Sequence, residues 1–127
     1  GDLYIVVNVR PHSTYKRRGD DLYLDMPITF EQAALGDDLV VPTLEEKVSY
    51  KIPAGTQPNT VFRLRGKGVK GVRSARKGDL YVTVVLEVPT KLNSKQKKAI
   101  KKMSEEVGTD CYSKKSSFLD AVKDFFS

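Results

Sequence analysis

The stretch Val61-Phe62-Arg63-Leu64-Arg65-Gly66-Lys67-Gly68-Val69, followed soon by Gly78-Asp79-Leu80-Tyr81, decides the fold of this 127-residue chain. Its β-branched and aromatic residues predict a strand over 61–64. The Gly-rich basic segment 66–78 predicts a long loop. After this loop, apolar residues alternate through a last strand, at Leu80, Val82, Val84, Leu86 and Val88. Two strands joined in this way indicate a β-rich domain.

The residues before this stretch predict four more strands and one short helix. Strands are expected over 3–9, 22–28, 39–41 and 48–52. A helix follows Thr29, because Thr29 and Gln32 have the spacing of a capping box and Gly36 stops the helix. A turn over 43–46 joins the two middle strands. Six short strands with one internal helix predict a mainly β fold, a small β-sandwich with a helical C-terminal tail.

The tail has the pattern of two helices. Asn93 and Gln96 repeat the capping-box spacing, and Gly108 ends the first helix. Ser117 is the predicted cap of a second helix of about ten residues, too short to be stable alone in water. Apolar residues recur along the first helix at Ile100, Met103 and Val107, and along the second at Phe118, Leu119, Val122, Phe125 and Phe126. This apolar stripe is expected to pack against something.

The composition is that of a globular, charged chain, with 39% hydrophobic and 30% charged residues and a formal net charge of +6. No apolar run approaches the ~20 residues that cross a bilayer, and no signal peptide is recognisable. Cys111 is the single cysteine, which favours a reducing, cytoplasmic location. Basic residues without acids gather over 63–77 and 91–102. Such runs are either solvated faces or a nucleic-acid surface, here over 63–77.

No residue pattern indicates catalysis. The segment 66–71 fits G-x-G-x-x-G, but a strand and not a helix is expected after it, so dinucleotide binding is not expected. His12 is the only histidine and has no partner at metal-ligand spacing. Glu45 and Glu46 lie in the predicted turn and are expected to be solvated. The chain is therefore predicted not to be an enzyme.

The first residues of the chain resemble a later segment of the same sequence. Residues 1–7 and 78–84 share five of seven amino acids, Gly-Asp-Leu-Tyr among them. Either a β-domain has been duplicated and 1–10 is the last strand of a truncated first copy, or Gly-Asp before apolar alternation is common turn chemistry. The duplication predicts four parts: that strand, a linker over 11–20, a second β-domain over 21–92 and the tail over 93–127. The abrupt start indicates an excised fragment.

Several motifs together resemble the C-terminal β-domains of DnaJ-type co-chaperones, over residue 1 to about residue 96. Tyrosine replaces the usual phenylalanine in the linker motif at Tyr15. In chain order the motifs are His12-Ser13-Thr14-Tyr15-Lys16-Arg17, Gly19-Asp20-Asp21-Leu22-Tyr23, Ala33-Ala34-Leu35-Gly36, Val41-Pro42-Thr43-Leu44, Ile52-Pro53-Ala54-Gly55-Thr56-Gln57 and Phe62-Arg63-Leu64-Arg65-Gly66-Lys67-Gly68.

The resemblance implies that the chain holds the second domain of a two-domain β-sandwich arm. Such arms bind unfolded polypeptides, deliver them to a DnaK-type ATPase chaperone and dimerise through the C-terminal end. The His-Pro-Asp motif of the J-domain and the cysteine repeats of the zinc module are absent from this sequence. No cofactor is therefore expected here, and the link to the DnaK-type partner would require a J-domain that this sequence lacks.

Two sets of residues are candidates for binding. Dimerisation is assigned to the tail stripe, with packing onto the chain's own sandwich as the alternative: Ile100, Met103, Phe118, Leu119, Val122, Phe125 and Phe126. Polypeptide binding, by an apolar pocket or by addition to a strand edge, is assigned to five strand residues, although core packing is the favoured alternative for most of them: Leu22, Leu24, Val48, Tyr50 and Ile52.

Overall fold

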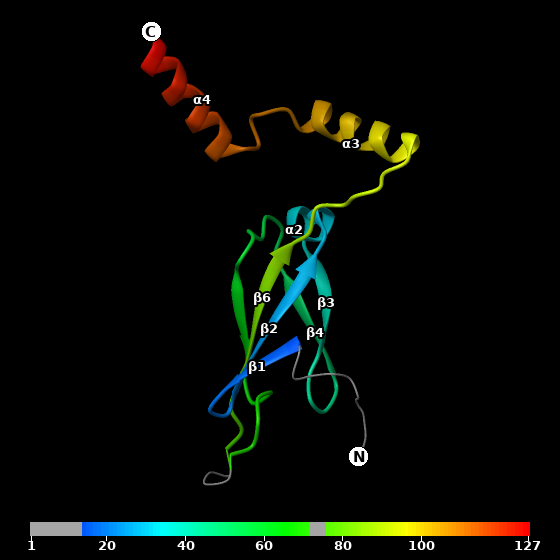
Figure 1. Cartoon of the computed structure of the whole chain (residues 1–127), viewed down its shortest axis with the longest axis vertical. Helices are drawn as coiled ribbons and strands as arrows, with labels where there is room; N and C mark the ends of the chain where they lie inside the picture. Colours follow the sequence, from blue (N-terminus) through cyan, green and yellow to red (C-terminus); the bar gives the residue numbers. More distant parts are fainter. Residues whose placement is uncertain (1–13, 72–75) are drawn as a thin grey trace. The chain divides into compact units, whose positions relative to one another are not determined.

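The computed structural model describes residues 14–71 and 76–127 (Figure 1). The chain divides into two compact units, residues 1–88 and 89–127. The described part of the first unit holds all the strands and a short helix, and the second holds two helices. This agrees with the expected mainly β fold and helical tail. The boundary expected after Leu92 falls within the second unit.

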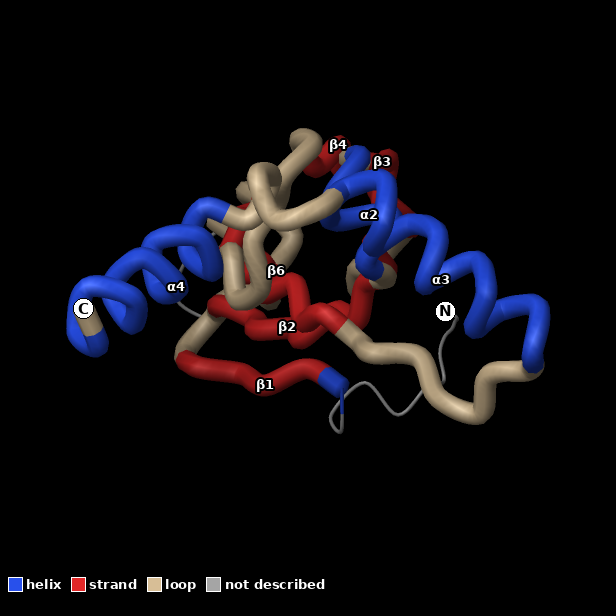
Figure 2. Tube along the Cα trace, turned by 90° about the horizontal axis from the view of Figure 1, so that it is seen from above, coloured by secondary structure: helices blue, strands red, loops and turns tan. Residues whose placement is uncertain are grey.

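Two sheets make up the first unit. The four-stranded sheet has the order β1-β2-β6-β5, in which β2 and β6 run parallel while β1 and β5 are antiparallel to their neighbours. The strands β3 and β4 form a separate antiparallel pair. Figure 2 shows β1, β2 and β6 side by side. The bounds are β1 Tyr15–Arg18, β2 Asp21–Ile28, β3 Asp37–Pro42, β4 Lys47–Ile52, β5 Val61–Leu64 and β6 Leu80–Leu86.

Strand β1 lies where the sequence predicted a linker. Its single apolar residue, Tyr15, is buried in the core, whereas Lys16, Arg17 and Arg18 are exposed. One apolar residue among three basic ones has no detectable alternation, so this strand depends on its pairing with β2. The strand predicted over 3–9 lies outside the described residues.

One apolar core joins the two sheets. Leu39 and Val41 of β3 and Leu80, Val82 and Val84 of β6 are the most completely buried side chains. Alternate residues of β2 and β6 face this core, and the residues between them face outward. Buried residues from both sheets belong to the same cluster, with Tyr15, Leu22, Leu24, Ile28, Ala33, Ile52, Phe62 and Leu64 as its other members. The sandwich architecture follows from this shared core.

Helix α2 (Phe30–Leu35) has the predicted capping box. The backbone N–H of Gln32 donates to the Thr29 hydroxyl at 3.1 Å, and that of Thr29 donates to the Gln32 side chain at 3.0 Å. Gly36 ends the helix with φ 80°, and a Cβ there would lie 2.8 Å from the Ile52 carbonyl oxygen. The helix is anchored through Ala33, which is buried.

The tail contains α3 (Ser94–Val107) and α4 (Ser113–Phe126). The predicted capping box of Asn93 and Gln96 and the stop at Gly108 are both present. The predicted start at Ser117 is wrong, because α4 begins at Ser113 after Tyr112, with no side-chain cap. Serine and lysine fit the first turn of a helix without marking its first residue. Neither these helices nor α2 is long and apolar enough to cross a membrane.

Candidate polypeptide-binding and dimerisation surfaces

The five predicted polypeptide-binding residues do not form an open apolar surface. Leu22, Leu24 and Ile52 have exposed fractions of only 5%, 4% and 2% and belong to the core. Val48 and Tyr50 are half-buried and pack against the same core. This burial favours the core-packing alternative for the three aliphatic residues. Of the five residues, only Val48 and Tyr50 are exposed enough for a ligand on the surface to contact them.

Tyr50 also connects the two sheets. Its ring stacks on that of Phe62 in β5, with centroids 3.8 Å apart and an interplanar angle of 3°. Stacking of this kind uses one face of each ring. Tyr50 therefore has a structural role that limits how much of it a ligand can reach.

Strand edges occur among the described strands of the first unit. Within residues 14–71 and 76–127, β5 ends the four-stranded sheet, and β3 and β4 form a pair of their own. Apolar side chains are exposed on these strands, at Val40 (57%) and Val61 (55%). An edge strand offers unpaired backbone groups to an extended peptide. The features needed for strand addition are thus present. Two cavities near the loop between β5 and β6 are lined by charged residues and glycines and offer no apolar pocket.

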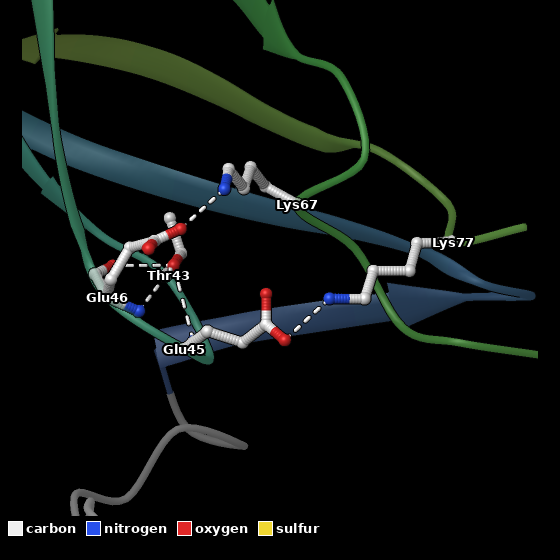
Figure 3. Close-up of polar contacts among 5 residues, drawn as sticks. All are labelled: Thr43, Glu45, Glu46, Lys67 and Lys77. Carbon is white, nitrogen blue, oxygen red and sulfur yellow. Dashed lines mark hydrogen bonds and ion pairs between the residues drawn. The ribbon is translucent and has the colours of Figure 1, made fainter.

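A polar cluster connects the β3–β4 turn to the long loop between β5 and β6 (Figure 3). Lys67 Nζ lies 2.5 Å from a Glu46 carboxylate oxygen, and Lys77 Nζ lies 2.5 Å from one of Glu45. The turn itself is closed by Thr43, whose hydroxyl accepts the backbone N–H of Glu46 at 3.0 Å. The two glutamates, which were expected to be solvated, are indeed exposed, and each is also paired with a lysine.

The pairing changes the acid–base behaviour of these groups. The hydrogen bond from Lys77 and its charge lower the pKa of Glu45. The hydrogen bond to Glu46 raises the pKa of Lys67. All these side chains are solvent-accessible, so each pair contributes little to stability. Their effect is to position the loop and to neutralise two cations of the basic run over 63–77.

The glycines of this loop allow close backbone packing. The Asp79 carboxylate accepts the Gly66 N–H at 2.9 Å, and Asp21 accepts the Asp79 N–H at 2.7 Å. A Cβ at Gly78 would lie 2.1 Å from the Asp20 carbonyl oxygen, and one at Gly68 would lie 2.4 Å from it. The G-x-G-x-x-G segment thus belongs to a connection between antiparallel strands, as expected, and the next described element is the strand β6.

The predicted dimerisation residues are all exposed. Along α3 and α4 no side chain is buried. Phe118, Phe125 and Phe126 have exposed fractions of 65%, 82% and 80%, and the last two rings meet edge to face at 5.1 Å. The other predicted dimerisation residues have exposed fractions of 37–46%: Ile100, Met103, Leu119 and Val122. The tail therefore presents an accessible apolar stripe.

Candidate metal ligands are not clustered. Among residues 14–71 and 76–127, no three His, Cys, Asp or Glu side chains come together as a possible metal site. Cys111 is a free, exposed thiol, and His12 lies outside the described residues.

Comparison with known proteins identifies the family. The DnaJ C-terminal domain model matches residues 1–89. The chain is 51% identical over 126 residues to the chaperone protein DnaJ of Clostridioides difficile, covering 99% of this chain and 33% of that protein. The chain is also 49% identical over 130 residues to the chaperone protein DnaJ of Cupriavidus taiwanensis, and this match covers 100% of this chain and 34% of that protein. The chain spans about a third of the length of these relatives, none of which is named for nucleic-acid binding. With its core, loop and tail all within the matched regions, the chain belongs to the DnaJ C-terminal domain family.

Proposed function

We propose that this chain acts as the second C-terminal β-domain and dimerisation tail of a cytoplasmic DnaJ-type co-chaperone. It would bind unfolded polypeptides in an auxiliary role, in support of a DnaK-type ATPase chaperone. Family membership supports the chaperone role, and the match to a third of the relatives supports a fragment of the complete co-chaperone. The exposed apolar stripe of α4 is the observation that carries dimerisation.

Polypeptide capture would use strand edges together with exposed apolar side chains. The edge strand β5 and the isolated β3–β4 pair offer backbone groups for extended chains of many sequences. Val40 and Val61 add apolar contacts beside them. The binding would be weak for one short segment, because exposed valines are smaller anchors than the aromatic side chains that dominate tight interfaces.

Dimerisation would bury the stripe. Phe118 and Phe125 are among its most exposed members, and an aromatic side chain buries roughly 150–250 Å² when it is covered. Helices of this length are marginal alone in water. Association of two tails about a two-fold axis would cover both stripes and stabilise both helices.

Sedimentation across a concentration series tests this assignment. We expect residues 1–127 to form a dimer, and a chain stopped at Leu92 to be a monomer. Phe118→Ala combined with Phe125→Ala should weaken dimerisation by a factor of ten or more, because two central aromatic anchors are lost. Leu35→Ala, which removes an equally exposed side chain (70%) from α2, serves as the matched control.

A dimer that persists unchanged in the double variant would exclude the stripe as the interface. A full-length monomer would exclude dimerisation through the tail and leave polypeptide binding as the remaining role.

A further inference from the structure

The outward face of the four-stranded sheet carries an ordered row of side chains. In the register of the strands, Lys16 of β1 pairs with Tyr23 of β2, Tyr23 with Tyr81 of β6, and Tyr81 with Arg63 of β5. Tyr23, Tyr81 and Arg63 each have a buried residue on either side, which belongs to the opposite face of the sheet. In β1, Tyr15 before Lys16 is buried in the same way. A cation, two tyrosines and a second cation therefore cross the whole sheet in one line.

The cations of this row can accept a new partner. Within residues 14–71 and 76–127, no ion pair joins Lys16 to a carboxylate. Arg63 lies 3.8 Å from the Asp79 carboxylate, too far for a hydrogen bond, so its donors remain usable. Arg18, in register with Asp21, and Arg65 flank the row. A shallow hollow of about 410 Å³ opens beside Arg63 and Arg65, and its lining holds more cations than acids, with Asp79 as its one carboxylate. This end of the face attracts anions.

The tyrosine pair favours carboxylates over stacked bases. The two rings are nearly parallel, with centroids 5.1 Å apart and an interplanar angle of 12°, so each covers one face of the other. Strand side chains stand roughly perpendicular to the sheet, so the pair directs ring edges and hydroxyls outward. Ring edges carry partial positive charge and the hydroxyls donate hydrogen bonds. Asp25, exposed next to Tyr23 on the same face, limits the positive region on that side.

We propose that this row, Lys16–Tyr23–Tyr81–Arg63, is a docking site for an extended acidic peptide segment of a partner protein. Adjacent strands lie about 4.8 Å apart, so the three intervals from Lys16 to Arg63 span about 14 Å. An extended peptide covers the same distance in four residues and directs every second side chain to one face. Acidic residues at i, i+2 and i+4 therefore match Lys16, the tyrosine hydroxyls and Arg63. This site depends on charge and is additional to the apolar capture proposed above.

Fluorescence anisotropy with the full chain and a labelled Gly-Glu-Ser-Glu-Ser-Glu-Gly peptide at low salt tests the site. We expect saturable binding that Lys16→Glu weakens about fivefold or more, because one attraction becomes a repulsion. Lys51→Glu makes the same charge change on an exposed lysine of β4 and should leave the affinity unchanged. A peptide of the same composition with its three glutamates adjacent should bind more weakly, because neighbouring side chains point to opposite faces.

Three results would overturn the proposal. Absence of binding, or equal losses with Lys16→Glu and Lys51→Glu, would mean that no specific site exists. Equal affinity for the two peptides would mean attraction to charge without register. Tighter binding of a labelled single-stranded oligonucleotide, with the same sensitivity to Lys16→Glu, would make this face a nucleic-acid surface. NMR can also test the location of the site. Chemical-shift changes of backbone amides that are confined to Tyr23, Tyr81 and their neighbours when the peptide is added would support it.

Discussion

At the scale of single residues, Tyr15 shows how one side chain holds the two sheets together. It projects from β1 into the core, and its hydroxyl donates a hydrogen bond to the Pro42 carbonyl oxygen at the end of β3. Phenylalanine at this position would fill the same space without that bond. The hydroxyl therefore adds a polar contact between strands that belong to different sheets.

Tyr15→Phe should lower the free energy of unfolding by about 1 kcal/mol, the net contribution of a typical hydrogen bond. Urea denaturation with the full chain measures the change. Tyr23→Phe is the matched control, because the exposed Tyr23 hydroxyl makes no hydrogen bond within the described residues. An unchanged midpoint for Tyr15→Phe would mean that the bond contributes nothing in solution.

The same residue predicts a pH dependence. Burial raises the pKa of Tyr15 above its ordinary value of 10.0, so the folded state keeps the phenolic proton when the unfolded state has lost it. The stabilisation from the neutral tyrosine is thus complete below pH 10.0 and is lost as the pH rises through the folded-state pKa. Tyr15→Phe should show a smaller loss of stability on this alkaline side than the unaltered chain.

At the scale of elements, the cap of α2 decides how that short helix meets the core. Six residues form too few internal hydrogen bonds for independent stability, so the capping box and the burial of Ala33 hold the helix in place. The Ala33 carbonyl oxygen also accepts the backbone N–H groups of Gly55 and Thr56, each at 2.9 Å. The helix thereby anchors the loop after β4.

Thr29→Ala should destabilise the first unit by about 1 kcal/mol, because the Gln32 N–H loses its acceptor. Thermal or urea unfolding followed by near-ultraviolet signals of the tyrosines measures the loss. Thr29→Ser retains a hydroxyl acceptor and should recover most of the stability. Equal destabilisation by both substitutions would attribute the effect to the lost methyl group and not to the cap.

At the scale of the whole molecule, the proposed dimer would bring two weak polypeptide-binding units together. A long unfolded chain can engage both, and the second contact is then intramolecular, which raises the overall affinity without any new interaction. Contacts between apolar groups and backbone are also much less sensitive to salt than contacts between charges.

We expect residues 1–127 to bind a permanently unfolded, reduced and carboxamidomethylated protein at least tenfold more tightly than a chain stopped at Leu92. The affinity for the unfolded protein should stay within about twofold between low and moderate salt. Salt screens interactions between exposed charges and leaves contacts between apolar groups nearly unchanged. Titration calorimetry measures both quantities, with a single short apolar peptide as the control that should not distinguish the two chains. Equal affinities of the two chains for the unfolded protein would rule out bivalent binding.

The sequence alone was sufficient for features whose causes lie within a few residues. Thr29 with Gln32 and Asn93 with Gln96 predicted two helix starts, because a capping box is a contact across three residues. Period-two apolar residues predicted β2 and β6, because alternation follows from strand geometry. The start of α4 was missed, because its first turn has no side-chain cap.

Only the tertiary structure decided the features that join distant parts of the chain. The parallel pairing of β2 with β6 and the contact of Glu45 with Lys77 each need a partner far away in the sequence. The Tyr15 side chain of β1 likewise finds its hydrogen-bond acceptor at Pro42, in the other sheet. The row from Lys16 to Arg63 has the same origin, since four strands in a particular order bring it together. Local patterns specify the faces of an element, whereas strand order depends on which faces can be buried together, a property of the whole core.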